Sequence, residues 1–296
     1  MRKMLVLFAL AALLGVSQLR ADEASWTAAA TPFRIAGNLY YVGSEELAAY
    51  LVVTPQGNIL INSNLESSPK QIRASVEKLG FRWSDVKILL ISQGHYDHCA
   101  GSAQIVRETG AKYEVMAEDV PVVESGGHTD FYLAHDKTTW FPRAHVDRAL
   151  HDGDTVTLGG TTLTAHKTAG HNKGTTTWTM DVQEDGRTLH AVIVGGPYVL
   201  PGYKLVGNAQ YPAIADDFAR GFATLKALPC DLFLGAHASY FGMQKKYARF
   251  VAGDKNAFID PAGYRAFVAD TEQAFRAELE RQRHTARSAH QARPGL

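Results

Sequence analysis

The chain has 296 residues, with 30 basic and 30 acidic side chains that give a formal net charge of zero at pH 7. A balanced chain has no general electrostatic attraction for polyanions, which argues against nucleic acid as a partner. We interpret the basic cluster Arg276, Arg281, Arg283 and Arg287 as a solvated helix end followed by a frayed polar tail from about residue 280.

The N-terminus has the pattern of a secretory signal over residues 1–21. Arg2 and Lys3 provide a basic start, and the apolar stretch of residues 5–16 is too short to span a bilayer. Cleavage would leave residues 22–296 as one large domain in the periplasm, expected to be a monomer with no membrane attachment. An uncleaved anchor is the alternative, and the lack of a following stop-transfer pattern argues against it.

The two cysteines, Cys99 and Cys230, are too few for a disulfide framework, and the sequence has no C-x-x-C metal pattern. Export would place them in an oxidising compartment, where a disulfide between them is allowed. Cys99 directly follows a cluster of polar residues, but a small buried thiol is the default interpretation for it.

The first half of the chain has the pattern of a β-meander followed by alternating helices and strands. Turn residues over 54–58 separate two of the short apolar runs. Amphipathic patterns predict the helices, and a continuous apolar run predicts a buried strand between them. The predicted elements are strands at 39–42, 50–53 and 59–61, a helix at 68–79, a strand at 86–92 and a helix at 100–110.

The second half again combines strands with a helix. Gly159-Gly160 between two threonine-rich runs predicts a hairpin. The predicted elements are strands at 155–158, 161–164, 175–180 and 191–194, a helix at 214–228 and a short buried strand at 232–234. Histidines recur where strands end, and loops at strand ends can converge on one site.

The run Q-G-H-Y-D-H at residues 93–98 follows the predicted buried strand and contains four side chains that could bind metal. Imidazole nitrogen and carboxylate oxygen are zinc ligands. In an extended turn His95 can point one way while Asp97 and His98 point another, so that one loop serves two metal ions. This motif is specific enough to predict a metal site rather than surface histidines. The amide oxygen of Gln93 is uncharged and is a poorer zinc donor than imidazole.

Two further histidines follow predicted strands. His171 lies in a Gly-rich turn after the strand at 161–164, and His237 comes just after the strand at 232–234. A lone histidine is more often a structural residue than a ligand. Only the position of each one, just after a predicted strand, favours metal binding. The other histidines lack such context, and we interpret them as surface or structural residues: His128, His135, His145, His151, His166, His190, His284 and His290.

Several further segments accompany residues 93–101. They are Thr168-Ala169-Gly170-His171, Gly235-Ala236-His237-Ala238-Ser239, the run from Pro201 to Asn208, Tyr211-Pro212 and Ala215-Asp216-Asp217-Phe218. With these segments the chain resembles the metallo-β-lactamase superfamily, and most of all the subclass B3 metallo-β-lactamases. The resemblance covers essentially the whole mature chain, and the last three segments narrow it to the subclass.

The resemblance implies an α/β fold of the αββα sandwich type, in which two mixed β-sheets pack face to face with helices outside. By matched position, a first Zn²⁺ would be bound by Gln93, His95 and His171, and a second by Asp97, His98 and His237. The resemblance also implies zinc-dependent hydrolysis of the β-lactam amide bond of penicillins, cephalosporins and carbapenems, and hence antibiotic resistance. A metal-bound hydroxide, oriented by Asp97, would attack the carbonyl.

Two departures from the family pattern concern metal and substrate binding. Most of the subclass has histidine where Gln93 stands, although a minority branch has glutamine, so one zinc in the Asp97 site is an alternative to two. The serines that often precede Pro201 are replaced by glycine and apolar residues. Lys173 and Ser239 are candidates for the missing contact to a substrate carboxylate, and each is also plausible as a solvated loop residue.

A third departure concerns the cysteines. The cysteine that matches Cys230 often pairs with a later cysteine in relatives, and none follows here, so that disulfide cannot form. Aromatic residues could wall a substrate groove, although core packing is the commoner role of aromatics at strand positions. The candidates are Tyr40, Trp140, Phe141 and Tyr198.

Two alternative functions stay open. One is a thioesterase or lactonase of the same superfamily. Such enzymes usually have an aspartate that bridges both metals after the strand matching 191–194, and Gly195-Gly196-Pro197 at that place argues against them. The other is a non-catalytic periplasmic zinc-binding protein whose site is weakened by Gln93. No G-x-S-x-G or S-x-x-K motif appears with supporting context, so no serine nucleophile is predicted.

Overall fold

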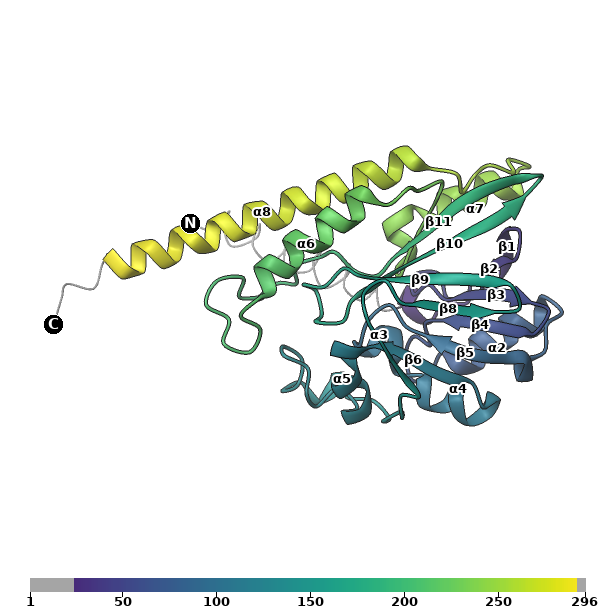
Figure 1. The fold of residues 1–296 in the computed structure, drawn as a ribbon, viewed down its shortest axis with the longest axis horizontal. Coiled ribbons are helices and arrows are strands. Elements are labelled where there is room, and N and C mark those ends of the chain that lie inside the picture. Colours follow the sequence, from purple (N-terminus) through teal and green to yellow (C-terminus); the bar gives the residue numbers. More distant parts are fainter. Residues whose placement is uncertain (1–23, 292–296) are drawn as a thin grey trace, which may run out of the picture.

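A computed structural model of the protein describes residues 24–291, and the predicted signal over residues 1–21 lies outside them. Two β-sheets pack face to face, and helices lie on the outside of the pair (Figure 1). The predicted α/β sandwich of the αββα type is therefore confirmed.

The first sheet begins as an antiparallel meander and continues with parallel strands. Its strands, in the order in which they pair, are β1 (Phe33–Ala36), β2 (Leu39–Tyr41), β3 (Tyr50–Thr54), β4 (Gly57–Ile61), β5 (Val86–Leu90), β6 (Lys112–Met116) and β7 (Arg148–Leu150). Parallel neighbours need a crossover connection. Helix α2 (Pro69–Lys78) lies in the crossover from β4 to β5, and α4 (Ser102–Thr109) lies in that from β5 to β6.

The second sheet contains five strands within residues 24–291, in the pairing order β12-β11-β10-β9-β8. Their bounds are β8 (Thr155–Leu158), β9 (Thr161–Lys167), β10 (Thr176–Glu184), β11 (Arg187–Val194) and β12 (Leu232–Gly235). The predicted hairpin is confirmed: Gly159 and Gly160 both have positive φ angles, at 53° and 86°, which a two-residue hairpin turn of this kind requires. Helix α6 (Ile214–Ala227) connects the parallel pair β11 and β12.

The remaining helices flank these sheets. They are α3 (Tyr96–Cys99), α5 (Val120–Ser125), α7 (Met243–Val251) and α8 (Pro261–Gln291), and short 3-10 turns occur at Trp83–Asp85, Ala117–Asp119, Lys137–Thr139 and Ala238–Phe241. Apolar side chains of α2, α4 and α5 pack with the outer face of the first sheet. Helices α6 and α8 pack against each other and against the second sheet, on the opposite side of the molecule (Figure 1).

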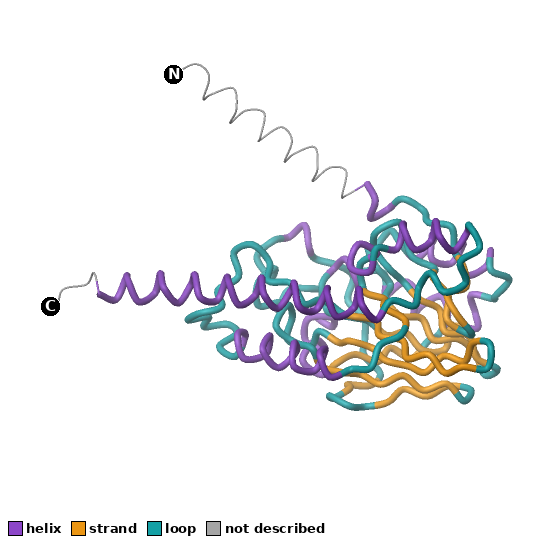
Figure 2. Tube along the Cα trace, turned by 90° about the horizontal axis from the view of Figure 1, so that it is seen from above, coloured by secondary structure: helices purple, strands orange, loops and turns teal. Residues whose placement is uncertain are grey.

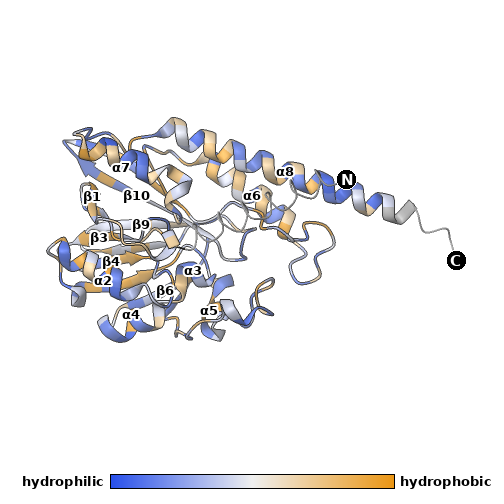
Figure 3. Cartoon of the chain, turned by 180° about the vertical axis from the view of Figure 1, so that it is seen from behind, coloured by the Kyte–Doolittle hydropathy of each residue, from blue (hydrophilic) through white to orange (hydrophobic). Residues whose placement is uncertain are grey.

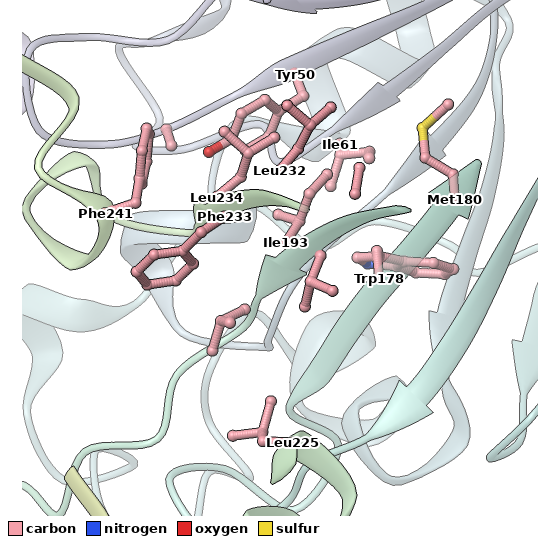
Figure 4. Packing of buried hydrophobic residues seen from close by; sticks show 14 of the residues in the cluster. Tyr50, Ile61, Trp178, Met180, Ile193, Leu225, Leu232, Phe233, Leu234 and Phe241 are labelled. Atoms are coloured by element: carbon pink, nitrogen blue, oxygen red, sulfur yellow. The ribbon is translucent and has the colours of Figure 1, made fainter. Parts of the chain in front are cut away.

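The main core lies between the two sheets, and Figure 4 shows part of it around Trp178, Ile193 and Leu234. Burying each large apolar side chain contributes about 1.5–3 kcal/mol. The polar atoms of two large aromatic side chains in this core are paired: Trp178 Nε1 donates to the carbonyl of Ile91, and the Tyr50 hydroxyl donates to the carbonyl of Gly235. These pairs join the sheets close to the ends of β5 and β12.

Helix α8 differs from the sequence prediction. It continues through the predicted polar tail to Gln291, and its C-terminal part projects beyond the rest of the fold (Figure 2). Figure 3 shows apolar and polar residues alternating along α8, and Phe275 and Leu279 are its last buried apolar side chains within residues 24–288. Beyond them, intrahelical ion pairs such as Arg281–Glu278 support an exposed helix. No helix within residues 24–291 is long and apolar enough to cross a membrane.

Candidate metal centre

Three strand ends bring the predicted ligands together at one edge of the sandwich. Residues 93–98 leave β5 and enter helix α3, His171 follows β9, and His237 follows β12. The end of β5 is fixed against the second sheet, because Nε1 of Trp178 donates to the carbonyl oxygen of Ile91 across 3.0 Å. The ligand segment therefore leaves a strand whose position relative to the other two segments is set by the core.

Asp97, His98 and His237 form one compact group. Oδ2 of Asp97 lies 3.2 Å from Nε2 of His98 and 3.3 Å from Nε2 of His237, and one ligand atom of each residue lies within 4.8 Å of the others. The His98 ring is fully buried, and neither of its nitrogens has a partner with hydrogen-bond geometry among the described residues. A buried polar atom left unpaired costs about 1–3 kcal/mol of stability. A cation between these three residues would remove that cost for Nε2 of His98.

The ionisation of this group is coupled. Burial would raise the pKa of the Asp97 carboxyl, but the adjacent His98 and His237 hold it well below its usual range. Burial would also lower the pKa of His237, yet its contacts with Asp97 and Glu46 outweigh burial and raise that pKa to about 9. For His98 burial prevails, and its pKa is lowered. In the metal-free group Asp97 is thus a carboxylate and His237 holds a proton, which a bound cation would displace.

Gln93, His95 and His171 form a second group around the same segment. The ring centroids of His95 and His171 are 4.9 Å apart, edge to face. The side chains of Gln93 and His171 both border Gly196, because a methyl group added there would lie 3.3 Å from Nε2 of Gln93 and 3.5 Å from Cδ2 of His171. Oε1 of Gln93 is buried and has no hydrogen-bond partner among the described residues. The structure therefore brings these three residues together and leaves a donor oxygen unpaired.

Both groups fit a zinc ion by their chemistry. Catalytic zinc sites typically have three protein ligands of imidazole or carboxylate type and one open position. The Asp97 group has two imidazoles and one carboxylate, and the other has two imidazoles and an amide oxygen. The buried, unpaired Oε1 of Gln93 and Nε2 of His98 are the atoms that such ions would satisfy. The weaker donor set is the one that contains Gln93.

Oxygen atoms behind the ligands orient three of the imidazole rings. The contacts are Nδ1 of His171 to the carbonyl of Tyr198 at 2.7 Å, Nδ1 of His237 to Oε1 of Glu46 at 3.2 Å, and Nε2 of His95 to Oδ2 of Asp130 at 3.3 Å. In each case one ring nitrogen faces an oxygen outside the two groups, and the other nitrogen is directed toward the predicted ligands. For His237 that other nitrogen, Nε2, faces Oδ2 of Asp97 at 3.3 Å. Such partners fix the tautomer and orientation of a ligating histidine.

Aromatic residues line one side of the centre. The Trp26 ring lies 6.0 Å from the ring of His237 and 6.3 Å from that of Tyr96. Beyond Tyr96, an open hollow of about 420 Å³ reaches Trp140. A larger hollow of about 760 Å³ lies around His166 on the second sheet. None of the predicted ligands lines either hollow, so the donor atoms themselves locate the candidate centre.

The three predicted substrate contacts lie near the centre, and each has an intramolecular partner. Ser239 donates to Glu46 across 2.5 Å, and the Lys173 ammonium lies 5.5 Å from the centre of the Tyr211 ring. The Tyr198 ring is 38% exposed and packs on Tyr240. Their roles in substrate binding stay predictions.

The other aromatic and sulfur-containing candidates serve mainly structural roles. Phe141 is buried in the core under the first sheet, and Tyr40 packs edge to face on Phe81. Cys99 is buried, and both Cys99 and Cys230 are free thiols, so the disulfide between them is not formed in this structure. Four of the histidines interpreted as surface or structural residues have local partners: His128, His145, His166 and His190, the last with Asp181 at 2.8 Å.

Sequence reasoning missed three carboxylates around the centre. Glu46 and Asp130 face ligand rings, and Asp119 accepts hydrogen bonds from the backbone of Gly94 and Gly174. Burial raises the pKa of Asp119 to about 7, although those two bonds act to lower it. Single acidic residues in loops carry no spacing signal, so only the folded chain identifies them.

Comparison with known proteins agrees with this geometry. Residues 48–183 match the metallo-β-lactamase superfamily. The native FEZ-1 metallo-β-lactamase from Legionella gormanii is 52% identical, with a TM-score of 0.86, and the match covers 86% of this chain and 98% of that one. The class B3 di-zinc metallo-β-lactamase LRA-12 from an Alaskan soil metagenome is 36% identical, with a TM-score of 0.83 and coverage of 86% and 97%.

A third structure is similar to the same degree. BJP-1, a subclass B3 metallo-β-lactamase of Bradyrhizobium japonicum, is 36% identical, with a TM-score of 0.82 and coverage of 88% of this chain and 98% of that one. These identities extend over nearly the full length of the three structures. Together with the grouping of all six predicted ligands, they point to the same family. The chain belongs to the metallo-β-lactamase superfamily and, within it, to subclass B3.

Proposed function

We propose that the protein hydrolyses the amide bond of β-lactam antibiotics with zinc as cofactor, acts on penicillins, cephalosporins and carbapenems, and so confers resistance. The observation that carries this proposal is the convergence of Gln93, His95 and His171 with Asp97, His98 and His237 in a chain 52% identical to a metallo-β-lactamase. Zinc at such ligands lowers the pKa of a water molecule to near 7 and polarises a carbonyl group.

The residues of the chain have separate roles in this proposal. Gln93, His95 and His171 would hold one zinc ion, and the Asp97 group would hold the other. The pKa of Asp97 is held well below its usual range, so its carboxylate would accept a hydrogen bond from the attacking water and orient it. Trp26 and Tyr96 place aromatic rings on one side of the centre.

The end of β11 argues against a thioesterase or lactonase. Those relatives usually have a metal-bridging aspartate there, whereas this chain has Gly195-Gly196. Gly196 lies against the side chains of Gln93 and His171, at the first group of ligands, and it presents no carboxylate. The geometry at this position thus favours two separate sets of ligands without a bridging side chain.

A substrate panel tests the proposal. Zinc-loaded protein is expected to hydrolyse a penicillin, a cephalosporin and a carbapenem, and a chelator is expected to abolish that activity. Asp97→Asn should lose it as well, whereas His190→Ala, which changes a histidine paired with Asp181 away from the centre, should keep it. Hydrolysis of thioesters or lactones with none of any β-lactam would refute the proposal. Bound zinc with no hydrolysis at all would favour a non-catalytic zinc-binding protein.

Two further proposals concern where and how the protein works. The predicted signal over residues 1–21 supports a periplasmic location, where β-lactams meet their targets. The complete set of ligands within one chain supports action as a monomer.

A further inference from the structure

Asp119 is a buried carboxylate whose two oxygen atoms contact two different ligand loops. It ends the 3-10 turn after β6 and is 1% exposed. Its Oδ2 accepts a hydrogen bond from the backbone N–H of Gly94 across 2.7 Å, and its Oδ1 accepts one from the backbone N–H of Gly174 across 2.8 Å. One side chain thus joins the loop after β5, in the first sheet, to the loop between β9 and β10, in the second sheet.

The two glycines allow this close approach. A methyl group added at Gly174 would lie 2.5 Å from Cγ and 2.8 Å from the backbone nitrogen of Asp119, and one at Gly94 would lie 3.3 Å from Cγ. Neither glycine has a positive φ angle. The space that Asp119 occupies therefore excludes a larger residue at Gly174, which would push its loop away from the carboxylate. At Gly94 a methyl group would displace the Asp119 side chain by a few tenths of an ångström.

The loops that Asp119 joins carry the ligands of one metal ion. Gly94 lies between Gln93 and His95, and Gly174 closes the turn that begins at His171. Asp97 and His98 follow on helix α3, and His237 comes from a third segment that Asp119 does not contact by any hydrogen bond within the described residues. A shift between the two joined loops would separate His171 from Gln93 and His95.

We propose that Asp119 is a positioning residue that clamps the 93–98 and 171–174 loops together, so that Gln93, His95 and His171 converge on the first metal ion. This inference rests on the first zinc site proposed above. It assigns Asp119 no contact with metal or substrate. Because Gln93 is a weak donor, the geometry that the clamp imposes contributes more to affinity here than it would with three imidazoles.

The test is a cobalt titration of metal-free protein that resolves the two sites by their visible spectra and by competition with a chromophoric chelator. Asp119→Asn keeps the shape of the side chain but directs an N–H₂ group at one backbone N–H. We expect the first-site affinity to fall about 10- to 100-fold, with a changed first-site spectrum, while the second-site affinity is unchanged. Gly174→Ala should give the same selective loss.

Asp260→Asn is the matched control. Asp260 also accepts a backbone N–H from a closely packed glycine, Gly263, across 2.8 Å, but it lies before α8 and contacts no predicted ligand. Melting temperatures of all metal-free variants are measured in parallel. The control should lower the melting temperature and leave both cobalt affinities unchanged.

The titration is run in the native chain and in a Gln93→His background, so that a weak first site becomes measurable. Equal losses at both sites, or an unchanged first site in Asp119→Asn, would overturn the inference. Failure to bind a second cobalt ion in either background would overturn it too, because no first site would exist to be positioned. β-Lactam hydrolysis is assayed separately, so that failure of the proposed function is distinguished from failure of the clamp.

Discussion

The Nδ1 atom of His171 donates a hydrogen bond to the carbonyl oxygen of Tyr198 across 2.7 Å. A carbonyl oxygen can only accept, so Nδ1 carries the proton and Nε2 has a free lone pair. Burial lowers the pKa of His171 to about 3, which keeps the ring neutral at any pH near 7. Tyr198 thus presents His171 in the one tautomer that can bind a metal through Nε2.

His171→Ala is expected to remove the first metal site and to spare the second. The reason is that the change deletes one donor of the Gln93 group and leaves Asp97 and its partners in place. Zinc content after dialysis against a fixed free zinc concentration should fall by one ion per chain. His166→Ala, which changes a histidine bonded to Thr179, is the control and should keep the native content. An unchanged zinc content in His171→Ala would show that His171 is not a ligand.

Gln93→His is expected to strengthen the first site. Replacing an uncharged amide oxygen by imidazole nitrogen improves the donor. Zinc affinity at the first site should rise, at least about tenfold, in competition titrations with a chelator, and the second site should not change. Gln56→His, in an exposed turn, is the control. Unchanged stoichiometry and affinity in Gln93→His would count against Gln93 as a ligand.

Glu46→Gln is expected to weaken the second site. Oε1 of Glu46 faces Nδ1 of His237 and also accepts from Ser239, so the change removes the charge that holds the ring in place. Loss of such a partner typically lowers metal affinity about 10- to 100-fold. Glu45→Gln, at the exposed neighbour, should have no effect in the same titration. Equal affinities in the two variants would contradict the role given to Glu46.

The stability of metal-free protein is expected to decrease as pH rises from about 6.5 to about 9. The pKa of His237 is about 9 in the folded chain because Asp97 and Glu46 outweigh burial, and it is lower when the chain is unfolded. The folded state therefore binds the extra proton, and its stabilising effect is complete below the unfolded pKa and lost above the folded one. Urea unfolding of the metal-free protein across this pH range measures the decrease in the free energy of unfolding.

Two comparisons check the origin of that pH dependence. Glu46→Gln removes one of the two carboxylates that raise the pKa of His237, so the decrease should be smaller and should end at lower pH. Zinc-loaded protein should not show this decrease in stability, because the metal displaces the proton from His237. A pH profile that is the same in native chain and Glu46→Gln would exclude His237 as its source.

Local patterns in the sequence identified most elements of this fold. Apolar runs and Gly159-Gly160 predicted β2 to β5 and β8 to β12, and amphipathic spacing predicted α2, α4 and α6. β1, β6 and β7 were not predicted. Lys112 and Glu114 interrupt the apolar pattern of β6, and β1 and β7 are short. The extent of α8 was missed because its last turns are held by pairs such as Arg283–Glu280 rather than by an apolar face.

The proposed metal ligands could be identified in the sequence because metal binding imposes residue types and close spacing. Gln93 to His98 form one motif, and His171 and His237 stand at strand ends. The residues behind them were not predictable, because Glu46, Asp119 and Asp130 act through contacts between segments far apart in the chain. No local pattern records which carboxylate will face which ring.

Zinc titration of the metal-free protein during β-lactam hydrolysis tests the central claim most directly. Activity should be absent without metal, and it should rise with zinc as the Asp97 and Gln93 groups are filled. The number of equivalents at which it reaches its maximum decides between one catalytic zinc and two. Hydrolysis at full rate in metal-free protein, or none at any zinc concentration, would contradict the account.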